Sequence, residues 1–113
     1  MRKYFDYFFT ILLIILGVCH TSLTPVFFKI FDLNALWFAG TGMAFIFLGL
    51  INIFRLRTAE LLIKSLCSLS NGLALIFCIL IVLKLNQPQA FISLLTLIFL
   101  IVMSLIDLRL ARR

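Results

Sequence analysis

Residues 73–100 read LALIFCILIVLKLNQPQAFISLLTLIFL, which is two apolar runs joined by the short turn 85–87. An α-helix rises about 1.5 Å per residue and the hydrocarbon layer of a bilayer is about 30 Å thick, so a transmembrane helix needs about 20 mainly apolar residues. A connection this short joins neighbouring antiparallel helices. Pro88 suits the first turn of the second helix, where its missing N–H loses no hydrogen bond. The stretch therefore predicts a transmembrane helical hairpin.

Similar apolar stretches precede this hairpin. Together the sequence contains four candidate spans, at about residues 5–24, 34–54, 60–83 and 89–108. The first ends where Pro25 disfavours helix in the residue before it. In the link that follows, phenylalanines recur at helical spacing, so residues 26–33 are expected to form a helical segment lying flat at the bilayer surface. The predicted fold class is an all-α membrane protein, with residues 1–113 forming one antiparallel bundle of four transmembrane helices.

The composition excludes an ordinary soluble domain. Of the 113 residues, 65% are apolar and 12% are charged, against about 25% charged residues in typical soluble domains. A chain this short has too little interior to bury so many apolar side chains, so they need lipid as their solvent. The net charge of +6 does not indicate nucleic acid as a partner, because the basic residues lie at the ends of the spans. The predicted partner is the lipid bilayer.

The distribution of Lys and Arg predicts the orientation, because cytoplasmic segments of membrane proteins carry an excess of these residues. If the N-terminus lies inside, the outer segments hold only Lys29 and Lys84. The inner segments then hold Arg2, Lys3, Arg55, Arg57, Lys64, Arg109, Arg112 and Arg113. Both termini are therefore predicted to be cytoplasmic, with Arg55 in the polar link between the second and third spans.

Small residues in the second span predict where helices pack. Helices in lipid associate through close backbone approach and a few hydrogen bonds. One narrow stripe of small residues consists of Ala35, Ala39, Gly42 and Gly49, and a second small pair consists of Gly40 and Ala44. The stripe is expected to contact a neighbouring helix rather than a cofactor, and no cofactor is predicted.

The densest polar cluster surrounds His20, the only histidine, at the outer end of the first span. An imidazole there can move protons, bind a metal or a lipid phosphate, or simply bond a loop carbonyl. The end of the first span and the start of the second lie at the same depth. The candidate ligand-binding residues at that depth are His20, Thr24, Trp37 and Thr41. In the third span, Asn71 is expected to bond a neighbouring helix, with a ligand contact as the alternative.

The preferred function is a non-enzymatic protein that binds a lipid, a quinone or a partner helix in the outer half of the bundle. One alternative is a membrane redox or metal-handling accessory, because Cys19 and Cys78 fall at similar depth near His20. Another is a small transporter formed by oligomerisation. The lack of a carboxylate in mid-span disfavours it, since the acidic residues lie near span ends, but His20 leaves a proton relay open. Enzyme chemistry is disfavoured, since the chain has no Gly-rich phosphate loop, H-E-x-x-H helix or G-x-S-x-G elbow.

A pattern between His20 and Asn52 carries a family resemblance. It contains His-x-x-x-x-Pro at residues 20–25, the run Ala-Leu-Trp-Phe-Ala-Gly-Thr-Gly at residues 35–42, and then Gly49 and Asn52. In these features the chain resembles a group of small bacterial inner-membrane proteins with no settled activity. More distantly, its layout is similar to that of DoxX-like four-helix membrane proteins. The resemblance implies a four-helix bundle in the bacterial inner membrane and assigns no catalytic residue.

Overall fold

The computed structural model describes residues 1–113 and contains helices as its only regular elements. The helices are α1 (Arg2–Ser22), α2 (Thr24–Phe27), α3 (Leu33–Arg57), α4 (Leu61–Lys84) and α5 (Pro88–Ala111). Four of them, α1, α3, α4 and α5, are long and apolar enough to span a membrane. The predicted helical class and the number of span-length helices are confirmed. The helix ends differ from the predicted ones by three residues or fewer.

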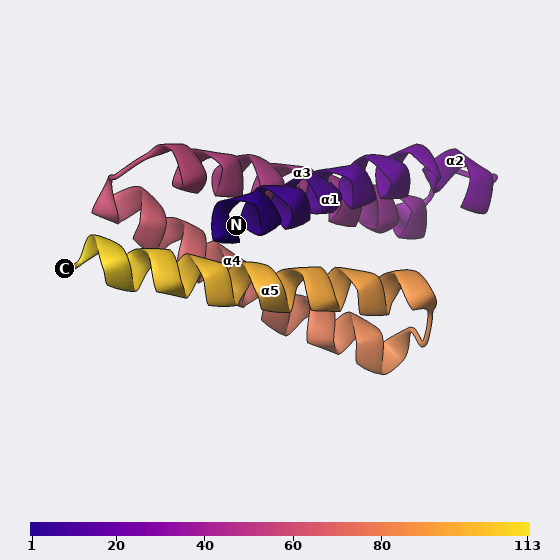
Figure 1. Cartoon of the computed structure of the whole chain (residues 1–113). Coiled ribbons are helices and arrows are strands. Elements are labelled where there is room, and N and C mark those ends of the chain that lie inside the picture. Colours follow the sequence, from indigo (N-terminus) through magenta and orange to yellow (C-terminus); the bar gives the residue numbers. More distant parts are fainter.

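The long helices alternate in direction and form an antiparallel bundle (Figure 1). The chain termini and the α3–α4 link lie toward one end of the bundle, which we call the terminal end. The α4–α5 turn and the segment containing α2 lie at the other end, the hairpin end. Helix α1 packs mainly on α3, and α4 packs mainly on α5. The bundle thus consists of two helix pairs, which diverge toward the hairpin end (Figure 1).

Local signals determine where the helices start. Asp32 precedes α3, and its Oδ1 accepts a hydrogen bond from the backbone N–H of Ala35 at 2.9 Å, which satisfies one of the free N–H groups of the first turn. Pro88 lies in the first turn of α5, as predicted. The helical segment expected over residues 26–33 does not form. Helix α2 ends at Phe27, where the backbone of Phe28 becomes extended, and the capping residue Asp32 before α3 is extended as well.

Glycines allow α1 and α3 to approach closely. A Cβ atom added to Gly17 would lie 2.6 Å from the carbonyl oxygen of Gly42, and one added to Gly42 would lie 2.7 Å from the carbonyl oxygen of Gly17. Only glycine fits at such a separation of two backbones. The close approach also lets the Thr21 hydroxyl donate to the carbonyl oxygen of Ala39 at 3.4 Å. This contact fixes the relative position of the two helix ends beside the cavity described below.

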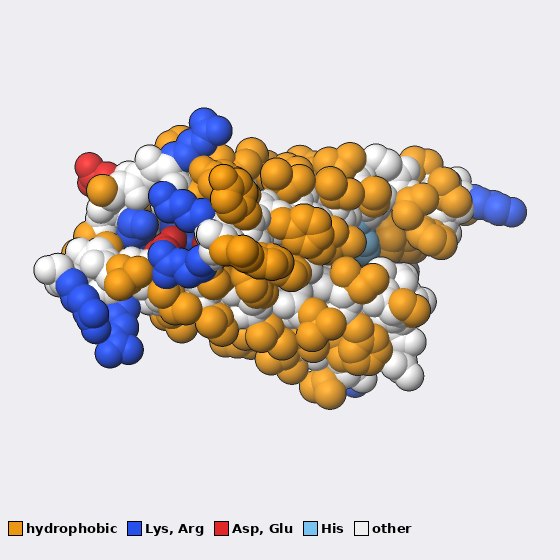
Figure 2. Space-filling view, viewed as in Figure 1, with side chains coloured by type: hydrophobic (Ala, Val, Ile, Leu, Met, Phe, Trp, Pro, Cys, Tyr) orange, Lys and Arg blue, Asp and Glu red, His pale blue; other side chains and the backbone are white.

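The exterior of the bundle is apolar along most of its length. Only 23 of the 113 residues are buried, so most large apolar side chains face outward. The apolar core consists of Leu13, Phe45, Leu48, Cys78, Leu97 and Leu100. Figure 2 shows a nearly continuous hydrophobic surface, with most basic side chains gathered at the terminal end. Exposing apolar surface to water costs about 25 cal/mol per Å², so an exterior of this kind suits lipid rather than water.

Candidate functional site

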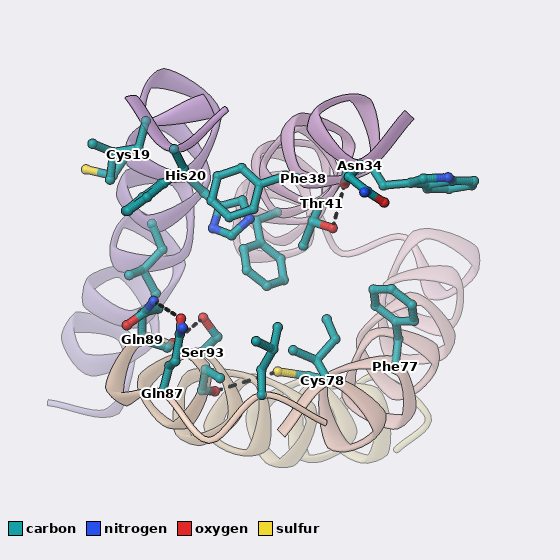
Figure 3. A pocket seen from close by; sticks show the side chains of 18 of the residues that line it. Cys19, His20, Asn34, Phe38, Thr41, Phe77, Cys78, Gln87, Gln89 and Ser93 are labelled. Atoms are coloured by element: carbon teal, nitrogen blue, oxygen red, sulfur yellow. Dashed lines mark hydrogen bonds between the residues drawn. The ribbon is translucent and has the colours of Figure 1, made fainter. Parts of the chain in front are cut away.

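A cavity of about 540 Å³ lies between the two helix pairs at the hairpin end (Figure 3). Its volume falls within the range of roughly 300–1,000 Å³ typical of small-molecule sites. Of the 19 lining residues, 13 are hydrophobic and none is Lys, Arg, Asp or Glu. The aromatic residues of the lining are Phe27, Phe28, Trp37, Phe38, Phe45 and Phe77. The polar and sulfur-containing ones are Cys19, His20, Asn34, Thr41, Cys78, Gln87, Gln89 and Ser93.

The imidazole of His20 is held against one wall of this cavity. Its ring stacks on the ring of Phe38, with 3.8 Å between centroids and 21° between planes. Phe27 and Phe28 pack around the same Phe38 ring, with centroid distances of 5.8 and 5.3 Å. His20 is half-buried, and its ring nitrogens form no hydrogen bond within the protein. An imidazole that is positioned by stacking and free at its nitrogens can donate to or accept from a ligand.

The structure brings three of the predicted ligand-binding residues, His20, Trp37 and Thr41, to this cavity. Thr24 does not line it. Thr24 is buried instead, because α1 ends at Ser22 and the Thr24 hydroxyl turns back to donate to the carbonyl oxygen of His20 at 3.4 Å. Apart from Cys78, which was a redox or metal candidate, the α4 and α5 residues of the lining were not predicted from the sequence, because which apolar residues of a span face inward depends on how the helices pack.

The two candidate redox residues, Cys19 and Cys78, both line the cavity but are not bonded to each other. Cys78 is buried on α4, and its Sγ lies 3.9 Å from the carbonyl oxygen of Ala90. Cys19 is exposed on α1, and Figure 3 shows its thiol pointing away from Cys78. No group of three or more His, Cys, Asp or Glu side chains could hold a metal ion. This geometry does not favour the redox or metal-handling alternative.

A second polar cluster, which was not predicted from the sequence, lies toward the terminal end. Arg55 is 0% exposed. The expectation that Arg55 lies in the α3–α4 link is wrong, because α3 continues to Arg57 and carries Arg55 into the bundle. Its Nη1 and Nη2 donate to the two carboxylate oxygens of Asp6 on α1, with 2.9 Å between Nη1 and Oδ2. Its Nη1 also donates to Asp107 on α5. Arg55 therefore joins three helices.

The charges of this cluster extend toward the protein surface. The Asp107 carboxylate also lies 3.5 Å from an Nη of Arg2 and 3.9 Å from Nζ of Lys64. Asp6 and Asp107 do lie near helix ends, as the sequence predicts, yet Asp6 is only 2% exposed. Charged hydrogen bonds between such groups are strong, but the groups are stable in an apolar interior only while each keeps its partner.

Asn52 continues the cluster toward the middle of the bundle. Its Oδ1 accepts from Nε of Arg55 at 3.2 Å, and its Nδ2 donates to Oδ1 of Asn71 at 2.8 Å. Asn71 in turn donates to Asn52 at 3.1 Å, so the two amides link α3 to α4 reciprocally. Asn71 thus lies apart from the cavity. The spacing of Asn52 and Arg55 by three residues puts both on one helix face, and this is the only part of the cluster that a local sequence signal could have indicated.

An apolar layer separates the cavity from the buried charges. Phe45 and Cys78 belong to the apolar core and also line the cavity. On the other side of the core, the Asn52 amide donates to the carbonyl oxygen of Leu48 at 2.9 Å, and the Asn71 amide donates to that of Leu100 at 3.5 Å. The bundle therefore has an uncharged cavity at one end and a buried ion-pair network toward the other.

The residues of the predicted small-residue stripe differ in their surroundings. Three of its members are buried and one, Ala39, is half-buried; the buried members are Ala35, Gly42 and Gly49. Gly42 and Gly49 lie against α1. Of the second small pair, Gly40 and Ala44, both are exposed, and nothing lies within 4 Å of a Cβ atom placed on Gly40.

The protein is therefore an all-α bundle with four helices long and apolar enough to span a membrane. It has an uncharged cavity at the hairpin end and a buried ion-pair network toward the terminal end. No protein-family model, curated protein or solved structure matches the chain. The resemblance to small bacterial inner-membrane proteins and to DoxX-like proteins therefore stays a prediction. Function has to be inferred from the geometry of the cavity and of the ion-pair network.

Proposed function

We propose that the protein spans the bacterial inner membrane four times, with both termini in the cytoplasm. The apolar exterior and the four span-length helices support insertion. The basic side chains at the terminal end support the orientation, because Lys and Arg accumulate on the cytoplasmic side. Arg55 is excluded from that count, since it is buried and paired with Asp6. Without Arg55, the excess of Lys and Arg at the terminal end is still large, because only Lys29 and Lys84 belong to the hairpin end.

Reporter fusions test this orientation. Alkaline phosphatase is active only when exported, so a fusion after Arg113 is expected to be inactive in bacterial cells, while a green fluorescent protein fused at the same place is expected to fluoresce. A phosphatase fused after Asn86, in the α4–α5 turn, serves as the matched control and is expected to be active. An active phosphatase after Arg113 would show that the orientation is reversed.

The proposed activity is binding of a small, neutral, lipid-soluble molecule in the cavity at the hairpin end. The observation that carries this proposal is the cavity of about 540 Å³ with a mainly apolar, uncharged lining and one imidazole free to form hydrogen bonds. Such a lining does not compensate a charged group, and burying an unpaired charge is strongly unfavourable. A molecule with an apolar body and a few neutral polar atoms matches it.

The geometry favours binding over catalysis. The two hydroxyls of the lining are each bonded to their own helix: Thr41 donates to the carbonyl oxygen of Trp37 at 3.0 Å, and Ser93 donates to that of Gln89 at 2.9 Å. Neither hydroxyl is bonded to His20, and neither is the thiol of Cys19 or Cys78, so the lining shows no nucleophile paired with a base, the usual arrangement for covalent catalysis. The protein is therefore proposed to be non-enzymatic.

A variant that obstructs the cavity tests the binding function. The protein purified gently from its membrane is expected to carry a neutral small molecule that native mass spectrometry detects. Thr41→Phe should remove that molecule, because Thr41 lines the cavity and its hydroxyl bonds only within α3. The matched control is Gly40→Phe, which adds the same ring one residue away, where a Cβ atom meets open space. Loss of the molecule from both variants, or retention in both, would contradict binding in this cavity.

A further inference from the structure

We propose that the molecule bound in the cavity is a quinone, a flat neutral ring with carbonyl oxygens on opposite edges and an apolar tail. This inference rests on the proposed binding function and names its ligand class. Three features of the cavity carry it: the absence of charge, the aromatic walls, and the unpaired imidazole of His20.

The absence of charge distinguishes a quinone from a phospholipid. A phosphate or carboxylate headgroup would need a cation or several N–H donors at the site. The lining contains no Lys or Arg, and the basic side chains of the structure lie mostly at the terminal end (Figure 2). A neutral head group is therefore the one that the cavity can hold without an unpaired charge.

The aromatic walls favour a flat ring over a simple aliphatic chain. Phe38 and Phe77 face the cavity from α3 and α4 (Figure 3), and the ring of His20 is already stacked on Phe38. Aromatic groups pair through offset stacking or edge-to-face contacts, which contribute about 0.5–1.5 kcal/mol beyond the burial of area. A planar ligand entering between these walls would gain contacts of the same kind.

The polar atoms of the lining match carbonyl acceptors. The His20 imidazole has an N–H donor without a partner, and the side-chain amide of Asn34 also forms no hydrogen bond within the protein. Quinone oxygens accept hydrogen bonds, and the same oxygens of the reduced form donate them. Because a neutral imidazole has one donor and one acceptor nitrogen, it can bond either form. His20 is thus the residue expected to hold the ligand head.

The divergence of the helix pairs provides a path for the tail. Helices α3 and α4 contact each other far less than each contacts its own partner, and the pairs separate toward the hairpin end (Figure 1). In a bilayer, the side of the cavity between α3 and α4 would face the acyl chains. A lipid-soluble ligand could then place its head in the cavity and leave its tail in the lipid.

Fluorescence of the single tryptophan provides the test, because Trp37 lies in the cavity lining. The full chain in phospholipid nanodiscs is titrated with a decyl-substituted benzoquinone, and quenching of Trp37 is recorded. We expect saturable quenching. His20→Ala should weaken the apparent affinity about tenfold, which corresponds to one lost hydrogen bond of about 1.4 kcal/mol. His20→Gln, which keeps an N–H donor, should restore most of the affinity.

Two controls separate binding from collisions in the bilayer. Thr41→Phe keeps Trp37 but projects a ring into the cavity where the ligand head is expected to lie, so it should show only non-saturable quenching. Gly40→Phe should behave as the unchanged protein. Unaltered circular dichroism and elution volume for each variant establish that the fold is intact.

The outcomes distinguish the ligand class from the binding function. Saturable quenching that depends on His20 and on an open cavity supports the quinone. If native mass spectrometry detects bound diacylglycerol or decyl alcohol while the benzoquinone gives no saturable quenching, then the quinone inference is wrong and the binding function stands. If neither the quinone nor these neutral lipids binds, and no molecule co-purifies, both proposals fail.

Discussion

Replacement of Arg55 by methionine is expected to lower the free energy of unfolding by about 3–5 kcal/mol, the range seen when one partner of a buried ion pair is removed. Methionine is unbranched and apolar, so the change removes the charge and the hydrogen bonds while keeping much of the volume. The buried Asp6 carboxylate would lose both of its hydrogen bonds from the Arg55 guanidinium, and the Asp107 carboxylate would lose its hydrogen bond from the same group. Unfolding by SDS in dodecyl maltoside micelles, followed by far-ultraviolet circular dichroism, measures the change.

The neighbouring Arg57 provides a matched control. It lies on the same helix but is exposed and forms no ion pair, so Arg57→Met should change the free energy of unfolding by about 0.5 kcal/mol or less. Adding Asp6→Leu and Asp107→Leu to the Arg55 variant should recover most of the lost stability, since replacing a whole buried ion network with apolar side chains is often neutral. Equal losses for the Arg55 and Arg57 variants would contradict the buried network.

Substitution of Gly17 by alanine is expected to lower the free energy of unfolding by about 2–3 kcal/mol, the upper part of the range for adding a methyl group to a packed interface. The added Cβ would lie 2.6 Å from the Gly42 carbonyl oxygen and 2.9 Å from the backbone nitrogen of Ile46. Both are main-chain atoms of α3, so the clash cannot be relieved by turning a side chain. Helices α1 and α3 would have to separate along the contact that positions His20 beside Phe38.

Gly40→Ala is the control for this prediction, because it adds the same methyl group where no atom lies within 4 Å. In an exposed helix interior, alanine is favoured over glycine by roughly 0.5–1 kcal/mol, so this variant should be as stable as the original or slightly more so. The same micelle unfolding assay compares the two. If the Gly17 variant is as stable as the Gly40 variant, then the close α1–α3 contact is not formed.

The helices themselves could be predicted from the sequence because the signal for each one is local. A run of about 20 apolar residues satisfies its own backbone hydrogen bonds as a helix wherever it lies, so its existence does not depend on its neighbours. Pro88 and the short turn before it are local signals as well, because they predict the start of α5 from adjacent residues alone. For this reason the predicted spans and the observed helices agree within a few residues.

The ion-pair network could not be predicted in the same way. Arg55 directly follows Phe54, the last residue of the predicted second span, a position that normally places the charge outside the span. Its burial depends on Asp6, 49 residues earlier, and on Asp107, 52 residues later, both reaching the same point in the bundle. No local pattern specifies that meeting, because it arises from the packing of three helices.

The cavity could be predicted from the sequence in part. Residues His20, Trp37 and Thr41 could be grouped from the sequence because adjacent antiparallel spans place them at equal depth, and all three line the cavity. On the opposite wall only Cys78 was singled out, and its neighbours, including Phe77, were not identified, since depth along a helix does not tell which way a side chain faces. The break after α1 also turned Thr24 away from its expected place.

Apolar length, proline position and basic clusters are properties of short segments, so they alone determine that this chain forms four span-length helices and which ends of those helices are basic. Which faces meet is a property of pairs of segments far apart in the chain. The tertiary structure therefore decides that Gly17 meets Gly42, that Arg55 is buried between carboxylates, and that the helix pairs diverge to leave a cavity. The physical reason is that apolar side chains fit lipid and the bundle interior equally well, so close packing and a few polar bonds select the interface.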